Sequence, residues 1–353
     1  MLFRSKYENI NFAALHVAGW YDIFLGGSLR GYKGYNQLGG DLAKGHQKLI
    51  IGPWCHGMWG SRTQGELYYP STAVGSSLIS KWEELLLDEV IFENEHPEQW
   101  EEPVAYYLMG DVDDPKVDAN KWKFAKDWPL SYTAKPWYFG QKENSLILVD
   151  DASVLDGAKN FSYLFNPVMP LETRGGNNLF TSPMGPVDQR PVEEPNGVLR
   201  SDLLLFESAL LMKPLTFEGD LSVKLVITSN CTDTDFMVKL TDVYPDGRRI
   251  LIRDGALTTR FRDVDFTAIT AAERRLTENF LIPGQVYEIT INLLALAYQF
   301  NKGHRIAVTI SSSNNPRFKI NANTGGPLSQ SFTEGVIANN TILTGAGLSC
   351  IYM

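Results

Sequence analysis

The chain has 353 residues, 44% of them hydrophobic and 21% charged, so it has the composition of an ordinary globular protein and enough length for two domains. Its formal net charge of −9 argues against the basic surface on which nucleic-acid binding depends, and no apolar run is long enough to span a membrane. We therefore expect neither a nucleic-acid partner nor a membrane partner.

The first hundred residues alternate between apolar runs and helical patterns. Residues 13–18 and 48–52 are short apolar runs that we predict to be buried strands, and residues 28–38 between them have apolar side chains at helical spacing. Strand, helix and strand in this order form a βαβ unit, which requires a parallel sheet. Residues 80–92 are predicted to form a second helix. Two or three strands are too few to complete a parallel sheet. These elements therefore either pack on the rest of the chain or belong to a sheet whose other strands lie outside this sequence.

From about residue 103 onward, the chain is a series of short β-prone runs separated by Pro, Gly, Asn and Asp. The clearest runs are residues 104–109, 136–139, 203–208, 221–229, 235–244, 249–255, 286–294 and 305–312. Many short strands with turn residues between them are typical of a β-sandwich or jelly roll. The predicted fold class is therefore α/β plus all-β, with an α/β part at residues 1–100 and an all-β part at residues 101–353.

A polar cluster follows each of the first two predicted strands at the same distance. Asp22 lies four residues beyond the first apolar run, and His56 lies four residues beyond the second. Because neighbouring parallel strands end at the same edge of a sheet, both side chains should meet at the carboxyl edge, where open α/β sheets build their sites. A carboxylate beside an imidazole fixes the tautomer of the ring and stabilises its charged form. This arrangement is the Asp–His half of a nucleophilic triad.

The serine that would complete such a triad is not found in a suitable motif, because the sequence contains no G-x-S-x-G. In α/β hydrolases the chain order is Ser, Asp, His, whereas Ser28 follows Asp22 and Ser61 follows His56. Ser28 fits a helix N-cap better than a nucleophile elbow. Cys55 adjoins His56, but adjacent residues of an extended segment point in opposite directions, so we do not expect Cys55 to be the nucleophile.

The two motifs and several later segments resemble the X-Pro dipeptidyl-peptidase and cocaine-esterase family of acyl hydrolases, which includes α-amino-acid ester hydrolases and glutaryl-cephalosporin acylases. Val-Ala-Gly-Trp-Tyr-Asp at residues 17–22 looks like the family's triad-aspartate motif. Ile-Gly-Pro-Trp-Cys-His at residues 51–56 looks like its triad-histidine motif, with Cys55 where Ser or Tyr is more familiar. Further segments that carry the resemblance are residues 107–110, 120–122, 185–191, 233–236, 243–247, 303–306, 311–318 and 323–325.

The resemblance implies a serine-dependent acyl hydrolase that acts on a small ester, amide or peptide substrate and uses no metal or organic cofactor. It implies that His56 is the base and that Asp22 is the acid that orients it. Residues 1–100 would be the C-terminal part of an α/β-hydrolase domain, and residues 101–353 a jelly-roll domain. The family's N-terminal half, with the serine elbow and the oxyanion-hole donors, has no counterpart in this sequence. We therefore expect this chain to be inactive alone.

Several residues near these motifs have alternative interpretations. Trp20, Tyr21 and Trp54 either line an acyl pocket or belong to the core. His16, in the middle of a predicted strand, and His304, in a turn before a strand, are expected to be structural.

Two other functions remain open. The chain could be a non-catalytic jelly-roll module that binds carbohydrate or a partner chain, or a subunit whose missing half is supplied in trans. An uncovered edge of the parallel sheet favours association, so we expect a homo-oligomer or a complex with the missing N-terminal half. The first ten residues lack the apolar core of a signal peptide, which favours the cytoplasm without fixing the compartment. The three cysteines, Cys55, Cys231 and Cys350, have neither disulfide-framework nor zinc-site spacing.

Overall fold

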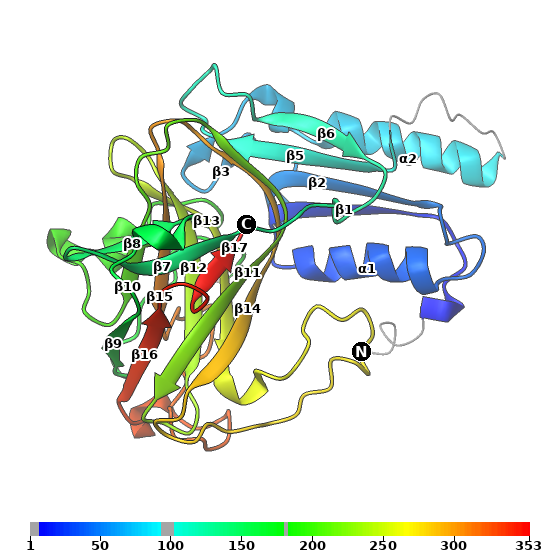
Figure 1. The fold of residues 1–353 in the computed structure, drawn as a ribbon. Helices are drawn as coiled ribbons and strands as arrows, with labels where there is room; N and C mark the ends of the chain where they lie inside the picture. Colours follow the sequence, from blue (N-terminus) through cyan, green and yellow to red (C-terminus); the bar gives the residue numbers. More distant parts are fainter. Residues whose placement is uncertain (1–6, 93–101, 180–182) are drawn as a thin grey trace.

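The computed structural model describes residues 7–92, 102–179 and 183–353, and in these residues β-strands predominate (Figure 1). The α-helices are α1 (Leu25–Leu38), α2 (Ser76–Ile91) and α3 (Arg190–Glu193). The strands are β1 (Ala14–Tyr21), β2 (Gln47–Cys55), β3 (Thr63–Gln64), β4 (Leu67–Tyr68), β5 (Val104–Gly110), β6 (Lys121–Ala125), β7 (Pro136–Lys142), β8 (Ser145–Val149), β9 (Lys159–Phe165), β10 (Leu204–Glu207), β11 (Leu215–Ser229), β12 (Asp235–Val243), β13 (Arg249–Thr258), β14 (Tyr287–Phe300), β15 (Arg305–Ser311), β16 (Ala338–Thr344) and β17 (Cys350–Tyr352). Short 3-10 helices are η2 (Tyr7–Asn9), η3 (Ser71–Ala73), η5 (Ala152–Val154), η6 (Pro195–Gly197), η7 (Thr259–Phe261) and η8 (Phe332–Glu334).

The N-terminal part is a parallel β1–α1–β2 unit, as the sequence predicts. The strands pair from Ala14 opposite Gln47 to Tyr21 opposite Cys55. β2 continues the parallel sheet by pairing with β5, whereas β1 pairs only with β2 among the described strands. The outer edge of β1 is therefore unpaired in the described part of the chain.

The two longer helices cover opposite faces of this sheet, because successive residues of a strand point to opposite sides. On one face, Leu29 of α1 belongs to the same core cluster as Leu49 and Ile51 of β2. On the other face, Trp82 of α2 clusters with Ile50 of β2. Figure 1 shows α1 and α2 on either side of the parallel strands.

β5 joins the parallel sheet to the all-β part of the chain. It pairs in parallel with β2 near its start and with β14 at its end, and β6 pairs with it antiparallel. The hydrogen-bonded sheet therefore runs from β1 into the all-β part, and one core cluster contains side chains from both parts. The predicted boundary between residues 100 and 101 lies outside the described residues.

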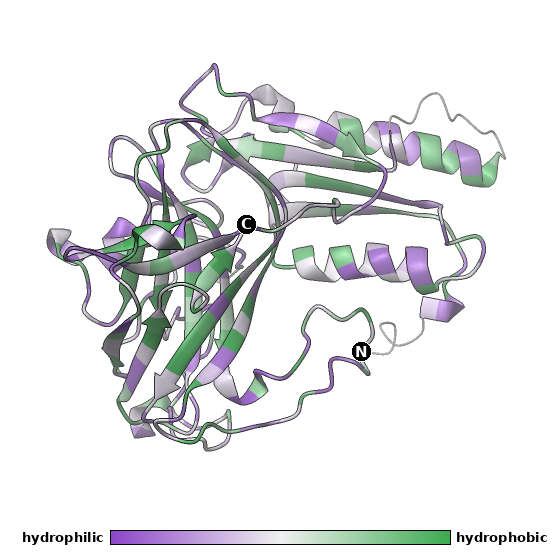
Figure 2. Ribbon diagram, viewed as in Figure 1, coloured by the Kyte–Doolittle hydropathy of each residue, from purple (hydrophilic) through white to green (hydrophobic). Residues whose placement is uncertain are grey.

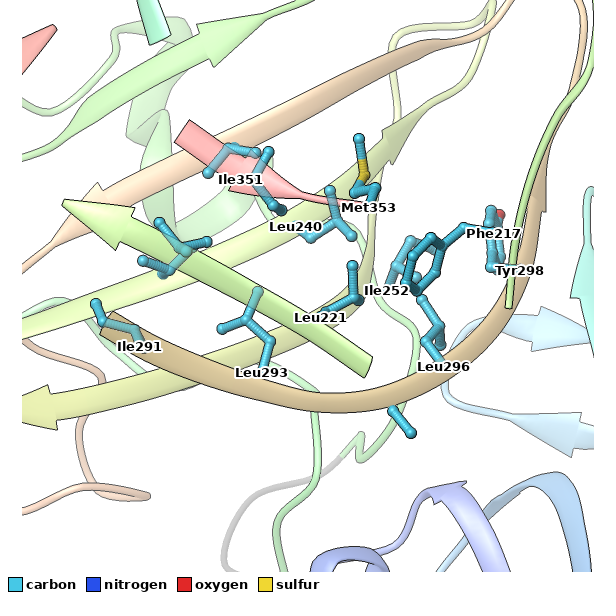
Figure 3. Close-up of a cluster of buried hydrophobic side chains, with 14 of the residues drawn as sticks. Phe217, Leu221, Leu240, Ile252, Ile291, Leu293, Leu296, Tyr298, Ile351 and Met353 are labelled. Carbon is cyan, nitrogen blue, oxygen red and sulfur yellow. The ribbon is translucent and has the colours of Figure 1, made fainter. Parts of the chain in front are cut away.

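The strands after β5 are mostly antiparallel and form layers that face each other. Their hydrogen-bonded order is β14-β11-β17-β7-β8-β10-β15-β12-β13. Figure 3 shows apolar side chains of β11 and β14 lying close to side chains of β12 and β13. Among them are Leu221, Leu293, Leu240 and Ile252, which are all fully buried. Figure 2 shows hydrophobic residues alternating with hydrophilic ones along many of the strands and on the two long helices. The core therefore lies between these layers, and the fold is mostly sheet with few helices.

All eight β-runs predicted from residue 104 onward are strands in the structure, and the largest differences from the predicted bounds are in β11 and β14, which are each six residues longer at one end. β11 begins at Leu215, and β14 continues to Phe300. The sequence pattern breaks at a bulge, where the pairing register shifts after Leu221 and Leu294 has a positive φ of 66°. A bulge shifts the alternation of buried and exposed residues by one position, so each strand looked like a shorter one.

Other strands were not predicted at all. β9 and β16 pair with each other through many polar residues, among them Asn160 and Asn339, which hide the alternation that reveals a strand. No helix in the described part of the chain is long and apolar enough to cross a bilayer.

Candidate active site

His56 and Asp22 lie side by side where β2 and β1 end. Nδ1 of His56 is 3.0 Å from Oδ2 and 3.2 Å from Oδ1 of Asp22. The histidine side chain is 44% exposed and the aspartate side chain 16% exposed, so the carboxylate is the more buried partner. The Phe24 ring contacts the imidazole edge-on, with 5.0 Å between the ring centroids. The structure therefore brings together the two residues that the sequence singled out.

The strands run further than predicted, which changes how the two side chains meet. β1 ends at Tyr21 and β2 at Cys55, so Asp22 and His56 each follow their strand directly and not at a distance of four residues. The predicted strands stopped early because both apolar runs end at a glycine. Gly19 pairs with Gly52, and a register shift then brings Tyr21 opposite Cys55, which aligns the next residue of each strand.

Asp22 is fixed by a tight turn that leads into α1. Its backbone N–H donates to the carbonyl of Gly19 at 3.0 Å, and its own carbonyl accepts from the N–H of Leu25 at 3.1 Å. Its Oδ1 accepts from the N–H of Phe24 at 2.8 Å. This turn starts α1 at Leu25, three residues earlier than predicted, so Ser28 lies inside the first turns of the helix and its predicted N-cap role is wrong.

Three glycines make room for Trp54, the residue two positions before His56, two of them for its indole and one for its backbone carbonyl. A Cβ atom at Gly52 would lie 2.2 Å from Trp54 Cε2, and one at Gly75 would lie 2.1 Å from Trp54 Cζ2. A Cβ at Gly19 would lie 2.2 Å from the Trp54 carbonyl oxygen. The indole N–H donates to the carbonyl of Ala73 at 2.7 Å. The glycines of both motifs are therefore explained by close packing beneath the site.

The last residues of the two strands, just before Asp22 and His56, are buried. Trp20 donates from Nε1 to the carbonyl of Tyr107 at 2.8 Å, and the Tyr21 hydroxyl donates to the carbonyl of Leu251 at 3.4 Å. Cys55 is 1% exposed, and burial raises the pKa of its thiol to about 12. A thiol with this pKa is protonated at neutral pH, so Cys55 is a poor nucleophile.

A cavity of about 510 Å³ adjoins the pair. Its lining residues are Val17, Ala18, Gly19, Asp22, Phe24, Ser28, Trp54, Cys55, His56, Gly57, Trp59, Ser76, Ile79, Ser80 and Glu83. Of the three aromatic residues considered for a substrate pocket, Trp54 lines this cavity, and Trp20 and Tyr21 do not. No serine of the described chain forms a hydrogen bond with His56, and the Ser61 hydroxyl donates instead to the carbonyl of Thr63 at 3.2 Å.

Two residues that the sequence analysis missed reach this site from the all-β part. Asn177 and Arg253 donate hydrogen bonds to backbone carbonyls of the segment from Trp20 to Asp22. They lie 155 and 233 residues from their partners in the chain, so no local pattern could have pointed to them. Within the residues described, no group of three or more His, Cys, Asp or Glu side chains is placed to hold a metal ion.

Comparison with known proteins places the chain among hydrolases. Residues 98–348 match the family described as the X-Pro dipeptidyl-peptidase C-terminal non-catalytic domain. The cocaine esterase of Rhodococcus sp. (strain MB1 Bresler) is 30% identical over 327 residues, which cover 91% of this chain and 52% of the esterase. The chain thus spans about half the length of this relative.

Solved structures share the fold. An aminopeptidase from a marine sediment archaeon, Thaumarchaeota archaeon, superposes with a TM-score of 0.76 at 22% identity, and an α-amino acid ester hydrolase with a TM-score of 0.73 at 21% identity. Each comparison covers 96% of this chain and 54% of the other. Together with the family match over residues 98–348, these likenesses identify the chain: it belongs to the X-Pro dipeptidyl-peptidase and cocaine-esterase family of hydrolases and corresponds to the C-terminal part of its members.

Proposed function

We propose that this chain supplies the acid, Asp22, and the base, His56, of a serine-dependent hydrolase that cleaves a small ester, amide or peptide. In this proposal, β1, α1 and β2 are the C-terminal part of an α/β-hydrolase sheet, and the strands from β7 onward are a jelly roll. The observation that carries the proposal is the 3.0 Å contact between His56 Nδ1 and the Asp22 carboxylate at the carboxyl ends of two adjacent parallel strands.

The geometry suits general-base chemistry. With Asp22 accepting from Nδ1–H, the proton-free nitrogen of a neutral His56 is Nε2, which can take the proton of a nucleophile and later pass it to the leaving group. The half-exposed ring, which has no other hydrogen-bond partner in the described chain, leaves Nε2 accessible. The negative carboxylate also stabilises the imidazolium that forms during the reaction.

The nucleophile in this proposal is a serine outside the described residues, on the same polypeptide or on a partner. The outer edge of β1 is unpaired in the described chain, so a further strand can add there beside Asp22. The likeness to relatives about twice as long supports a larger catalytic unit. Either source of the serine gives the same chemistry at His56.

Turnover of p-nitrophenyl acetate by this chain tests whether the Asp22–His56 pair needs a serine from elsewhere. We expect negligible hydrolysis, because losing the serine of a triad lowers the rate by about 10⁶-fold. Adding or fusing a serine-bearing N-terminal half from a relative should restore activity. Robust hydrolysis by the chain alone, blocked by a serine-directed fluorophosphonate, would contradict the proposal and point to Ser28 or Ser61.

A second candidate function is a non-catalytic module. The match of residues 98–348 to a domain described as non-catalytic favours it for the all-β part. A glycan-binding screen with the chain separates the candidates, because a binding module should retain a sugar ligand whether or not His56 is intact.

A further inference from the structure

Asn177 occupies a position where one side chain holds two carbonyls of the segment that carries Asp22. Its Nδ2 donates to the carbonyl of Trp20 at 3.0 Å and to the carbonyl of Asp22 itself at 2.9 Å. Asn177 is 4% exposed, so water does not compete for these hydrogen bonds. Asn177 therefore holds the backbone on both sides of the turn at which the carboxylate is presented.

Arg253, in β13, fixes the orientation of this amide. One of its Nη1 hydrogens points to Asn177 Oδ1 at 3.2 Å, and Nη1 also donates to the carbonyl of Trp20. Arginine has no acceptor, so the oxygen of the Asn177 amide must face the guanidinium and its NH₂ group must face the two carbonyls. Nη2 of Arg253 is anchored by the carbonyl of Ala295 at 2.6 Å.

The arrangement is unusual for a structural arginine. Arg253 is 1% exposed, forms no ion pair with a described carboxylate, and is paired instead with backbone carbonyls and the Asn177 amide. Burial lowers its pKa to about 10. A buried charge is costly unless it is well hydrogen-bonded, so a cation here calls for a reason beyond filling the core.

We propose that Asn177 and Arg253 are positioning residues for the Asp22–His56 pair: the all-β part of the chain holds the aspartate turn so that its carboxylate meets His56 Nδ1. The inference rests on the proposed function of this pair and adds a role for a part of the chain whose family description is non-catalytic. Neither residue touches the imidazole, and each acts through the backbone of the segment from Trp20 to Asp22.

The physical consequence concerns the tautomer of His56. A carboxylate held close to Nδ1 selects the Nδ1–H tautomer and protects that hydrogen from exchange with water. When the donors to Trp20 O and Asp22 O are lost, the backbone of Asp22 keeps only the hydrogen bonds of its own local turn, so the turn is free to relax. The population of Nδ1–H should fall, while the rest of the fold, which depends on the layered core, should persist.

The test is a ¹⁵N NMR measurement of the His56 tautomer in this chain, with His56→Gln to assign the signal among the five histidines. Asn177→Asp has the same shape and can still pair with Arg253, but it cannot donate to either carbonyl. We expect it to lose the protected Nδ1–H resonance, as Asp22→Asn should. Arg253→Met should weaken the resonance, and Arg253→Lys, which can still donate to Asn177 Oδ1, should recover part of it.

Asn340→Asp is the matched control. Asn340 is also buried and donates through Nδ2 to two partners, the hydroxyls of Thr234 and Ser312, but it touches neither Asp22 nor His56. This variant should keep the Nδ1–H resonance even where its melting temperature falls as much as that of Asn177→Asp. A loss of the resonance in both variants would mean that general destabilisation is responsible, and the proposal would be overturned.

The outcomes separate this inference from the function on which it rests. If the wild-type chain shows no protected Nδ1–H, the Asp22–His56 pair itself is wrong. If the wild-type chain shows it and Asn177→Asp retains it, the pair stands and the positioning role is overturned. Asn177→Ala, which removes the donors without adding a charge, covers the case in which Asn177→Asp fails to fold. If neither variant folds, Asn177 is a general folding residue and the inference fails.

Discussion

The buried His304 should make the stability of this chain fall at alkaline pH. Its Nδ1 lies 2.9 Å from Asp242 Oδ1 and its Nε2 lies 3.2 Å from Asp111 Oδ2, and its side chain is 2% exposed. Asp111 directly follows β5, Asp242 lies in β12 and His304 directly precedes β15, so the three side chains join the end of the parallel sheet to the all-β part. The Tyr298 hydroxyl donates to Asp242 Oδ2 at 2.7 Å.

The contribution of His304 to the free energy of unfolding follows from its raised pKa. Burial alone would lower the pKa of His304, but its hydrogen bonds and charge interactions with Asp111 and Asp242 outweigh it and raise the pKa from 6.5 to about 9. A group whose pKa is raised in the folded state stabilises the fold fully below its unfolded pKa and loses this contribution as the pH rises through the folded value. The shift corresponds to about 3 kcal/mol, which is present at pH 6 and should be lost by pH 10.

Urea unfolding at a series of pH values between 6 and 10 measures this effect. Asp111→Asn removes one of the two carboxylates and should flatten the pH dependence by roughly half, because the imidazolium then has one carboxylate partner. Subtracting the two curves removes the titration of other groups, including Lys48, whose pKa is lowered by burial. An unfolding free energy of the wild-type chain that is flat over this range, or an Asp111→Asn variant that follows the same curve, would contradict a stabilising protonated His304.

Further predictions concern packing and assembly. Gly52→Ala should lower the unfolding free energy by about 1–3 kcal/mol, because its Cβ would clash with the Trp54 ring. Gly60→Ala should be nearly neutral in the same melt, because the atom nearest to its Cβ would be Ser76 Oγ at 3.7 Å. Light scattering at rising concentration should show self-association through the open edge of β1, and a monomer at all concentrations would contradict it. Val17→Lys in β1 should weaken the association, whereas Leu42→Lys, at another exposed apolar residue, should not.

The pairing of Asp22 and His56 could be predicted from the sequence because it depends on local signals. Two apolar runs separated by a helical segment identified adjacent parallel strands, and the polar residues after them had to meet at one sheet edge. Asp22 and His56 could therefore be paired before the fold was known. The strand ends were misplaced because Gly19 and Gly52 interrupt the apolar runs but not the pairing.

The remaining features depend on contacts that no local pattern encodes. Asn177 and Arg253 lie 155 and 233 residues along the chain from the carbonyls that they bind, and these contacts arise only from the packing of the all-β part against β1. His304 was expected to be structural from its position in a turn before a strand. Its contacts with Asp111 and Asp242 join distant parts of the chain, and those partners could not be identified from the sequence. β9 and β16 were missed because polar residues hide their alternation.

The most direct test of the Asp22–His56 assignment is the esterase rate of this chain joined to a serine-bearing N-terminal half of a relative. His56→Ala should lower this rate by about 10⁶-fold, because members of a triad act as a unit. Asp22→Asn should lower it by about 10⁴-fold, because the imidazole then adopts the wrong tautomer. Cys55→Ser should change it little, since the buried thiol has no chemical role. Loss of activity in Cys55→Ser together with retained activity in His56→Ala would contradict the assignment of the site.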